Sequence, residues 1–403
     1  MTTDTAASPQ PGPRAGPASS PLPATPGGPP PGSRARWRVT SRRLADGREI
    51  LYVDEPGTPA RVAVDERPAE ERVASGELRW DGLTGDWVAM AGHRHNRVLL
   101  PPKDECPLCP HGVGSAPSEI PEEDYQVVVF ENRFPSYSPV SSGPQLPDFR
   151  GLLGTRPASG RCEVVCFTSR HDASFKDLPV ERVRMVIDTW AERTLTLGAR
   201  PDVEHVFCFE NRGPEIGVSL HHPHGQIYAY PYLPERTRAV LARAEAHLGA
   251  TGRLLGADLL AAERQERIRV VTSGTHWTAY VPFAARWPLE VHLAPHRDVP
   301  DLAALDDDER DELAVTYRDL LRRIDRFHVA ADGSPVPMPY IAAWHQAPAR
   351  AGRAASRLHL QLMSVLRAPG KLKYLAGSES GVGGWVNDVS PEQTARRLRE
   401  VAE

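Results

Sequence analysis

The stretch GVSLHHPHGQIYAY, residues 217–230, places polar side chains just before a β-rich apolar run. In an extended strand the side chains at positions i, i+2 and i+4 point to the same face. His222, His224 and Gln226 would therefore line one face of a short strand. A core strand would carry valine, isoleucine or leucine there, because each buried imidazole needs hydrogen-bond partners. The pattern is typical of a reaction site, and the alternative is a surface strand with incidental histidines.

Composition narrows the class of protein. The 403 residues suit two domains, and 40% hydrophobic with 25% charged residues is typical of a soluble globular chain. A net charge of -4 and the lack of a basic run in the sequence give little support for nucleic-acid binding. No stretch approaches the roughly 18 apolar residues of a membrane span, and the first residues have no apolar signal-peptide core. We therefore expect a cytoplasmic protein with no nucleic-acid or membrane partner.

The N-terminal residues differ in composition from the rest. Residues 1–36 hold ten of the 40 prolines, with glycine, alanine and serine between them. Such a segment cannot bury enough apolar surface to offset its loss of conformational entropy, so we expect a disordered tail. Order is expected from residue 37, with one half of the fold over residues 37–234 and a second over residues 235–403.

Apolar spacing and turn residues predict an alternation of strands and helices. Helices are expected over residues 179–197, around 238–260, over 306–326 and from Ser390, where Pro391 suits the first helical position and Gln393 would complete a capping box. A hairpin is expected over residues 77–91, and further strands over 125–130, 161–168, 203–209, 267–273, 277–282, 289–294, 340–345 and 358–364.

The two halves share an order of parts. A strand, an Arg/His/Asp turn, a helix and further strands run from Cys162 to Tyr230, and the same order recurs from Glu290 to Ser364. The strand at residues 358–362 then stands where the histidine strand stood in the first half. A duplicated α+β unit is the economical interpretation, and chance similarity of order is the alternative.

His224 is the candidate nucleophile. An imidazole with its ordinary pKa of about 6.5 keeps a ring nitrogen free at physiological pH, and phosphorus is a target it can attack. Gln226 on the same face can donate hydrogen bonds to phosphoryl oxygens without supplying a proton. A third histidine at that position could act as an acid and favour transfer to water. Glutamine favours transfer between phosphates.

Cys106-x-x-Cys109 has the spacing of half a structural zinc site. No second cysteine pair follows, so histidines must complete such a site, and His171 and His222 are the candidates. The alternatives are a redox pair, which the neighbouring prolines disfavour, and an incidental pair. The odd total of five cysteines argues against a secreted disulfide framework.

Other residues carry weaker signals. His345 and His359 are expected at the edge of the core, and their spacing gives no support for a second metal. Arg94 and Arg97 are candidates for gripping phosphate, with solvated arginines as the alternative. Three cysteines in apolar strands are expected to be buried small hydrophobes: Cys162, Cys166 and Cys208.

Together these motifs resemble the galactose-1-phosphate uridylyltransferase family of the histidine-triad superfamily. His222-Pro-His-Gly-Gln226 follows Phe209-Glu-Asn211 and Gly217-x-Ser219, as in the signature of that family. The resemblance runs from about Leu78 to the end and includes Leu83-Thr-Gly-x-Trp87, Cys106-x-x-Cys109, the Asn132 turn, Cys166-Phe-x-x-x-His171, Trp344-His345 and the terminal helix. It implies a duplicated histidine-triad-like α+β fold, with antiparallel sheets flanked by helices.

The resemblance implies a ping-pong reaction. UDP-glucose would give its uridylyl group to His224 and release glucose 1-phosphate. Galactose 1-phosphate would then take the group and depart as UDP-galactose, while Gln226 holds the phosphoryl oxygens. A homodimer is implied as well, because the sites of the family are shared between two subunits.

Further roles come from the resemblance alone. Contacts to nucleotide or phosphate are implied for Arg94, Arg97, Asn132, Asn211, Gly217 and Ser219. Hexose binding is implied for Lys373, Tyr374, Ser378 and Glu379. The implied zinc ligands are Cys106, Cys109, His171 and His222. Four protein ligands leave no open position, so this zinc would be structural.

The sequence departs from the family at two places. Some members bind a second metal, often iron, through one glutamate and three histidines. His345 and His359 match, but Gln361 stands at the third histidine and Val240 near the glutamate, so we expect no second metal. Ser378 replaces a tyrosine of the hexose segment, and residues 381–385 differ, which leaves the preferred sugar phosphate open.

Two other functions are compatible with these residues. One is a related nucleotidyl-transfer or phosphorolysis enzyme acting on ADP-sugars or dinucleoside polyphosphates. The other is a non-catalytic nucleotide-binding protein on the same scaffold. His224 and Gln226 argue against the second, since a pure binder needs no nucleophile.

Overall fold

The computed structural model describes residues 36–69, 72, 76–96, 100–114, 117–139 and 150–402. The tail expected at residues 1–36 lies outside these ranges apart from its last residue, and so does Arg97. From Trp37 to Glu403 the contacts form one unit. None of the helices in the described ranges is long and apolar enough to span a membrane.

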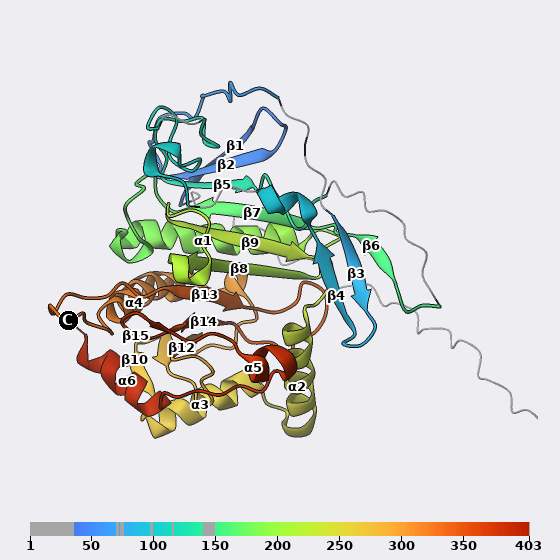
Figure 1. Cartoon of the computed structure of the whole chain (residues 1–403). Helices are drawn as coiled ribbons and strands as arrows, with labels where there is room; N and C mark the ends of the chain where they lie inside the picture. The colour runs from blue at the N-terminus through green and yellow to red at the C-terminus, as the bar shows by residue number, and fades with distance from the viewer. Residues whose placement is uncertain are drawn as a thin grey trace, which may run out of the picture. The chain divides into compact units, whose positions relative to one another are not determined.

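One antiparallel sheet holds most of the described strands (Figure 1). Its strands, in spatial order, are β1 (Arg38–Arg43), β2 (Glu49–Asp54), β5 (Val127–Glu131), β7 (Arg161–Cys166), β9 (His224–Tyr230), β8 (His205–Arg212), β13 (Tyr340–His345), β14 (His359–Ser364), β12 (Leu289–Pro295), β11 (Trp277–Tyr280) and β10 (Val270–Ser273). The predicted α+β fold with antiparallel sheets is confirmed.

The two halves meet where β8 pairs with β13, so the duplicated unit forms one continuous sheet. Outward from this pair the first half continues with β9 and β7, and the second with β14 and β12. Helix α1 (Val180–Gly198) connects β7 to β8, and α4 (Asp307–Asp325) connects β12 to β13. The matching order is what a duplication produces. The boundary between residues 234 and 235 falls just before the next helix and stays a prediction.

Helices α1 and α4 pack together against one face of the sheet (Figure 1). Helix α1 follows the predicted amphipathic pattern, and Val183, Ile187 and Trp190 on its apolar side are buried in the main core. Helix α4 begins with a capping box, in which the Asp306 carboxylate accepts the Glu309 N–H at 2.9 Å and the Glu309 carboxylate accepts that of Asp306.

Two helix predictions were partly wrong. The helix expected around residues 238–260 is two helices, α2 (Glu235–Thr251) and α3 (Leu255–Glu266), because Gly252 ends α2 with a left-handed φ of 70°. The last helix, α6 (Pro391–Glu400), starts at Pro391 as predicted, but no capping box forms. The Ser390 hydroxyl donates instead to the Glu392 carboxylate at 2.6 Å.

A three-stranded sheet lies on the face of the main sheet opposite α1. It consists of β4 (Asp86–Met90), β3 (Glu77–Asp81) and β6 (Thr155–Pro157), which confirms the predicted hairpin. Leu78 and Trp87 of this sheet pack with Tyr228 and Tyr230 of β9. The remaining described elements are β15 (Leu366–Ala368), β16 (Lys371–Leu372), α5 (Gly377–Val382) and the short turns η1 (Gly92–Asn96), η2 (Lys103–Glu105), η3 (Phe175–Asp177), η4 (Pro214–Ile216) and η5 (Leu302–Ala304).

Candidate active site

Strand β9 presents two kinds of side chain to opposite faces. Ile227 is buried in the core beneath α1, whereas His224 and Gln226 face away from that core. Gly225 lies between them, and a Cβ there would come within 2.8 Å of the Phe167 ring. Glycine therefore lets β9 pack closely enough to hold the two polar side chains in place.

The predicted alignment of three side chains holds for two of them. Strand β9 begins at His224, so His222 precedes the strand and is separated from it by Pro223. The His222 ring instead contacts Tyr125, with 2.8 Å between its Nε2 and the phenol oxygen. His224 and Gln226 thus lie on strand β9, whereas His222 lies in the loop before it and contacts Tyr125.

The His224 ring has one nitrogen engaged and one free to react. Its Nδ1 lies 2.7 Å from the carbonyl oxygen of His222. A carbonyl can only accept, so Nδ1 carries the proton and Nε2 keeps its lone pair. Burial lowers the pKa of His224, which keeps the ring neutral and nucleophilic at physiological pH.

Two cavities meet at His224. The first, of about 250 Å³, is lined by Gln226 and His224 on β9 and by Leu108, Phe130 and Val164, which give it an apolar wall. Three residues implied by the resemblance complete its polar side: Arg94, Asn132 and Ser219. The apolar wall and the polar groups suit a flat base joined to a phosphate.

The second cavity, of about 330 Å³, contains Asn211 beside His224 and is lined also by Lys176 and Arg212. Asn211 follows the last β8 residue that pairs with β9, which places it beside His224. Gly217 lines neither cavity. It ends η4 with a φ of 79° and turns the chain toward Ser219.

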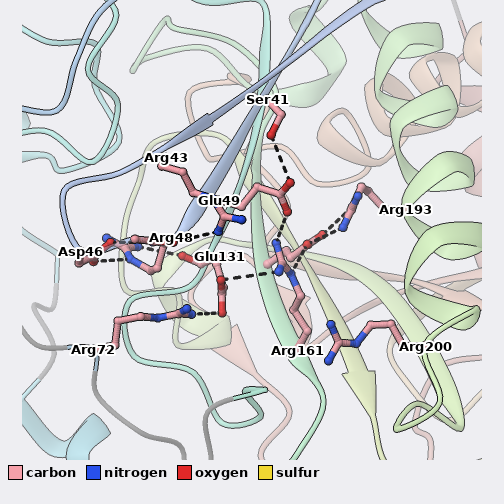
Figure 2. A network of polar contacts seen from close by, with 12 residues as sticks. Ser41, Arg43, Asp46, Arg48, Glu49, Arg72, Glu131, Arg161, Arg193 and Arg200 are labelled. Carbon is pink, nitrogen blue, oxygen red and sulfur yellow. Dashed lines mark hydrogen bonds and ion pairs between the residues drawn. The ribbon is translucent and has the colours of Figure 1, made fainter.

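A network of buried charges surrounds Glu131, the last residue of β5 (Figure 2). Arg161 contacts Glu163 at 2.6 Å and Glu131 at 3.6 Å, and Arg48 donates to the Glu131 carbonyl at 2.8 Å. Arg193 of α1 binds Glu163 with two hydrogen bonds of 2.8 and 2.9 Å. Arg48 therefore holds the backbone of Glu131 and Arg161 holds its carboxylate, which fixes the residue that precedes Asn132.

Several lining residues of the first cavity were missed in the sequence. Glu119 is buried there, held by Arg48 at 2.5 Å and Arg67 at 2.9 Å, and the guanidinium of Arg133 lies 3.5 Å from it. Arg133 follows Asn132 directly, which was the available signal. Glu119 had none, because only folding brings its loop beside β5.

The residues implied to bind hexose lie apart from His224 in this chain. Lys373, Tyr374, Ser378 and Glu379 line neither of the two cavities. Lys373 is buried, with its Nζ 3.4 Å from the Glu379 carboxylate, whereas Tyr374 is 76% exposed. The Ser378 hydroxyl donates to the Gly384 carbonyl at 2.6 Å.

Cys106, Cys109, His171 and His222 form a cluster able to hold a metal ion. One donor atom from each lies within 4.8 Å of all the others. The Cys109 sulfur is 3.3 Å from Nδ1 of His171 and 3.6 Å from Nδ1 of His222. Among the described residues this is the one group of three or more such donors that gathers so closely.

The tautomer of His222 suits metal binding. Its Nε2 lies 2.8 Å from the Thr168 carbonyl oxygen and from the Tyr125 hydroxyl, whose own proton goes to the Leu108 carbonyl at 2.9 Å. The Nε2 nitrogen therefore carries a proton, which leaves Nδ1 as the free donor toward Cys109. The other three cysteines are buried thiols, as predicted.

Two family models match the chain and together cover most of it. The N-terminal domain of galactose-1-phosphate uridyl transferase matches residues 66–234, and the C-terminal domain matches residues 240–403. The chain belongs to the galactose-1-phosphate uridylyltransferase family. The predicted resemblance is confirmed, and the chain is an enzyme of the nucleotidyl-transferring kind.

Galactose-1-phosphate uridylyltransferases from bacteria are similar over nearly their whole length. The one from Streptomyces lividans is 47% identical over 379 residues, which is 91% of this chain and 98% of the relative. The one from Thermotoga maritima is 34% identical over 80% of this chain and 98% of the relative. A solved uridylyltransferase structure is 33% identical, with a TM-score of 0.70 over 81% of this chain and 98% of the other.

The absence of the second metal, which the resemblance implies for some members of the family, stays a prediction. His345 and His359 line a cavity of about 160 Å³ with Val240, which offers no donor, and with the cationic Arg236. The Nε2 of His345 is engaged 3.0 Å from the amide oxygen of Gln361. The His345 and His359 rings are 4.9 Å apart and the His292 ring is 5.2 Å from that of His359, but among the described residues no three donors of this group lie within 4.8 Å of one another.

Proposed function

We propose that the chain exchanges a uridylyl group between UDP-glucose and galactose 1-phosphate through a covalent bond to His224. The observation that carries this proposal is the free Nε2 of His224 at the junction of two cavities, with its Nδ1 proton held by the His222 carbonyl. The ring can attack phosphorus through Nε2 without first losing a proton.

The two half-reactions balance as follows. The Nε2 lone pair bonds to the α-phosphorus, and the bond from that phosphorus to the bridging oxygen breaks, so glucose 1-phosphate leaves with the electron pair. A phosphate oxygen of galactose 1-phosphate then attacks the same phosphorus, and the bond to Nε2 breaks. In the intermediate the ring is cationic, and the hydrogen bond from Nδ1 to the His222 carbonyl stabilises that charge.

The remaining groups of the two cavities would position the nucleotide. Arg94, Asn132 and Ser219 would contact ribose or phosphate in the first cavity, and Asn211 would contact phosphate from the second. Gly217 would act by shaping the turn before Ser219. Arg97 is proposed as a further phosphate contact on the resemblance alone.

The hexose residues would reach a reaction site through a homodimer. Lys373, Tyr374, Ser378 and Glu379 do not line the cavities at His224 in one chain. Tyr374 and two nearby apolar side chains, Val382 and Val386, are 57 to 85% exposed, which suits a contact with a second subunit. Light scattering at micromolar concentration tests this proposal, and a monomer would contradict it.

Gln226 is proposed to hold the phosphoryl oxygens during transfer. Gln226→Met keeps the size of the side chain but removes both amide donors, so the rate of uridylyl transfer should fall by about 100- to 1,000-fold. Stopped-flow measurement of glucose 1-phosphate release checks this expectation. Gln265→Met, on the exposed side of α3, is the control and should leave the rate unchanged. A Gln226→Met enzyme of normal rate would contradict the role.

The metal of the Cys/His cluster is proposed to be zinc, with a structural role. Cysteine and histidine donors in this set suit zinc, and four of them would brace the loop before β9. Cys106→Ser should reduce the zinc content of the purified protein from about one equivalent to near zero. Metal analysis by mass spectrometry checks this, with Cys162→Ala as the control that keeps its zinc. Unchanged zinc in Cys106→Ser would contradict the site.

The chain is proposed to act in the cytoplasm, as the composition suggests.

The function itself is tested by incubating the protein with UDP-glucose alone. Release of glucose 1-phosphate and an acid-labile uridylyl adduct on the His224 peptide are expected. An adduct only with ADP-sugars would favour the related phosphorylases, and no adduct with any nucleotide would favour a non-catalytic binder.

A further inference from the structure

The second half of the sheet carries a changed copy of the catalytic pair. Gln226 pairs across β8 with Phe209, Phe209 pairs with Ala343 of β13, and Ala343 pairs with Gln361 of β14. Gln361 therefore lies in the same cross-strand row as Gln226. His359 precedes Gln361 by two residues, as His224 precedes Gln226. The amide of Gln226 lines an open cavity, whereas that of Gln361 is fully buried.

Hydrogen bonds engage both ends of the Gln361 amide. Its Nε2 donates to the Glu290 carboxylate at 2.6 Å, and its Oε1 lies 3.0 Å from Nε2 of His345. A carboxylate can only accept, so the amide nitrogen must face Glu290 and the amide oxygen must accept from His345. The His345 Nε2 thus carries a proton and is closed to a metal ion.

Glu290 collects hydrogen bonds from two directions. It is 3% exposed, and its Oε1 accepts from Gln361 and lies 3.2 Å from Nε2 of His292. Its Oε2 accepts the backbone N–H of Arg286 at 2.6 Å. Burial would raise the pKa of Glu290, but the bonds from His292, Arg286 and Gln361 outweigh that effect and lower it. A buried carboxylate therefore ties β14 to the loop at residues 285–287.

That loop supports the segment implied to bind hexose. The Trp287 and Trp385 rings are 5.1 Å apart, and the Arg286 guanidinium lies 5.3 Å over the Trp385 ring. The Asn387 amide donates to the carbonyls of Ala285 at 3.0 Å and Trp287 at 3.1 Å.

The support continues to the charged end of the segment. The buried Lys373 ammonium lies 6.0 Å from the centre of the Trp385 ring and donates a hydrogen bond to the Val386 carbonyl. Contacts thus run without a break from Gln361 through Glu290 and the 285–287 loop to Trp385 and Lys373.

We propose that Gln361 and Glu290 form a metal-free brace that positions the segment at residues 373–387 for the sugar phosphate. The brace lies beside His345 and His359, the two positions that match the second metal site implied by the resemblance. Gln361 and Glu290 are positioning residues, since they act on the sugar phosphate through the 285–287 loop. The inference rests on the proposed function for the hexose role of that segment.

The test separates sugar binding from nucleotide binding. Gln361→Met removes both hydrogen bonds of the side-chain amide at nearly constant size. Asn387→Ala removes the hydrogen bonds between the half-buried Asn387 and the 285–287 loop. In each variant the KM for galactose 1-phosphate should rise roughly tenfold. The Kd for UDP, which has no hexose, should stay within about twofold of its normal value. Leu360→Met, on the same strand but on the core side, should change neither constant.

Three results would overturn the brace. The first is an unchanged KM for galactose 1-phosphate in both variants. The second is an equal weakening of UDP and galactose 1-phosphate, which a general loss of structure would produce. The third is a second equivalent of bound metal in the unaltered protein. A missing His224 adduct in the unaltered protein would instead refute the proposed function, so the two failures are distinguishable.

Discussion

His224→Asn is expected to abolish uridylyl transfer. Asparagine keeps a polar group near the site but has no ring nitrogen with a free lone pair, so no covalent intermediate can form. Loss of a nucleophile typically lowers kcat by about 10⁴- to 10⁶-fold. The measurement is release of glucose 1-phosphate from UDP-glucose, together with mass spectrometry of the peptide that contains position 224.

His247→Asn provides the matched control. His247 of α2 is half-buried, and its Nε2 lies 2.8 Å from the Asp258 carboxylate. It lines neither of the two cavities that His224 lines. This variant should keep its activity, and both variants should keep the metal proposed for the Cys/His cluster. Residual transfer by His224→Asn within tenfold of normal would contradict the proposed mechanism.

Glu163→Ala is expected to give the largest loss of stability. Glu163 is fully buried and contacts two arginines, Arg193 of α1 and Arg161 of its own strand. Removal of the carboxylate leaves both cations without their shared anion in the core. Breaking a buried pair in this way costs about 3–5 kcal/mol of unfolding free energy. Urea unfolding followed by circular dichroism checks the expectation.

Glu192→Ala is the control for this variant. Glu192 lies 3.6 Å from the same Arg193, but its side chain is 53% exposed, so its removal should cost at most about 1 kcal/mol. Equal losses in the two variants would contradict the role of burial.

The loss in Glu163→Ala should also depend on pH. Burial would raise the pKa of Glu163, but Arg193 and Arg161 outweigh it and lower the pKa below its usual 4.5. A lowered folded-state pKa stabilises the protein above pH 4.5, and that contribution disappears as the pH falls through the folded-state value. The difference between the unaltered protein and Glu163→Ala should therefore shrink in acid. A constant difference from pH 7 to pH 3 would contradict this linkage.

Local patterns predicted much of the fold. The spacing of apolar residues located α1 and α4 to within a residue or two, because the helical period is visible wherever one side of a helix is buried. The break between α2 and α3 was missed, because a helix can tolerate an isolated glycine. The left-handed φ of Gly252, which ends α2, is visible only in the structure. The capping box expected at Ser390 failed because a nearer carboxylate competes for the hydroxyl.

The sequence by itself determined the chemistry available to the protein. His224 and Gln226 as candidate catalytic residues, and the Cys/His group as candidate metal ligands, can be proposed from residue types and spacing, because reactivity and metal preference belong to the side chains. Gly225 and Pro223 likewise set the local geometry that separates His222 from β9.

Only the tertiary structure decided which distant groups meet. The pairing of β8 with β13 joins the halves into one sheet. Arg48 and Arg67 hold Glu119 at the wall of the first cavity. The pairing of β14 with β12 and β13 brings Gln361 to Glu290 and His345. Such contacts join residues separated by up to a third of the chain. They depend on strand register and on the burial of whole faces, and no local pattern of residues encodes either.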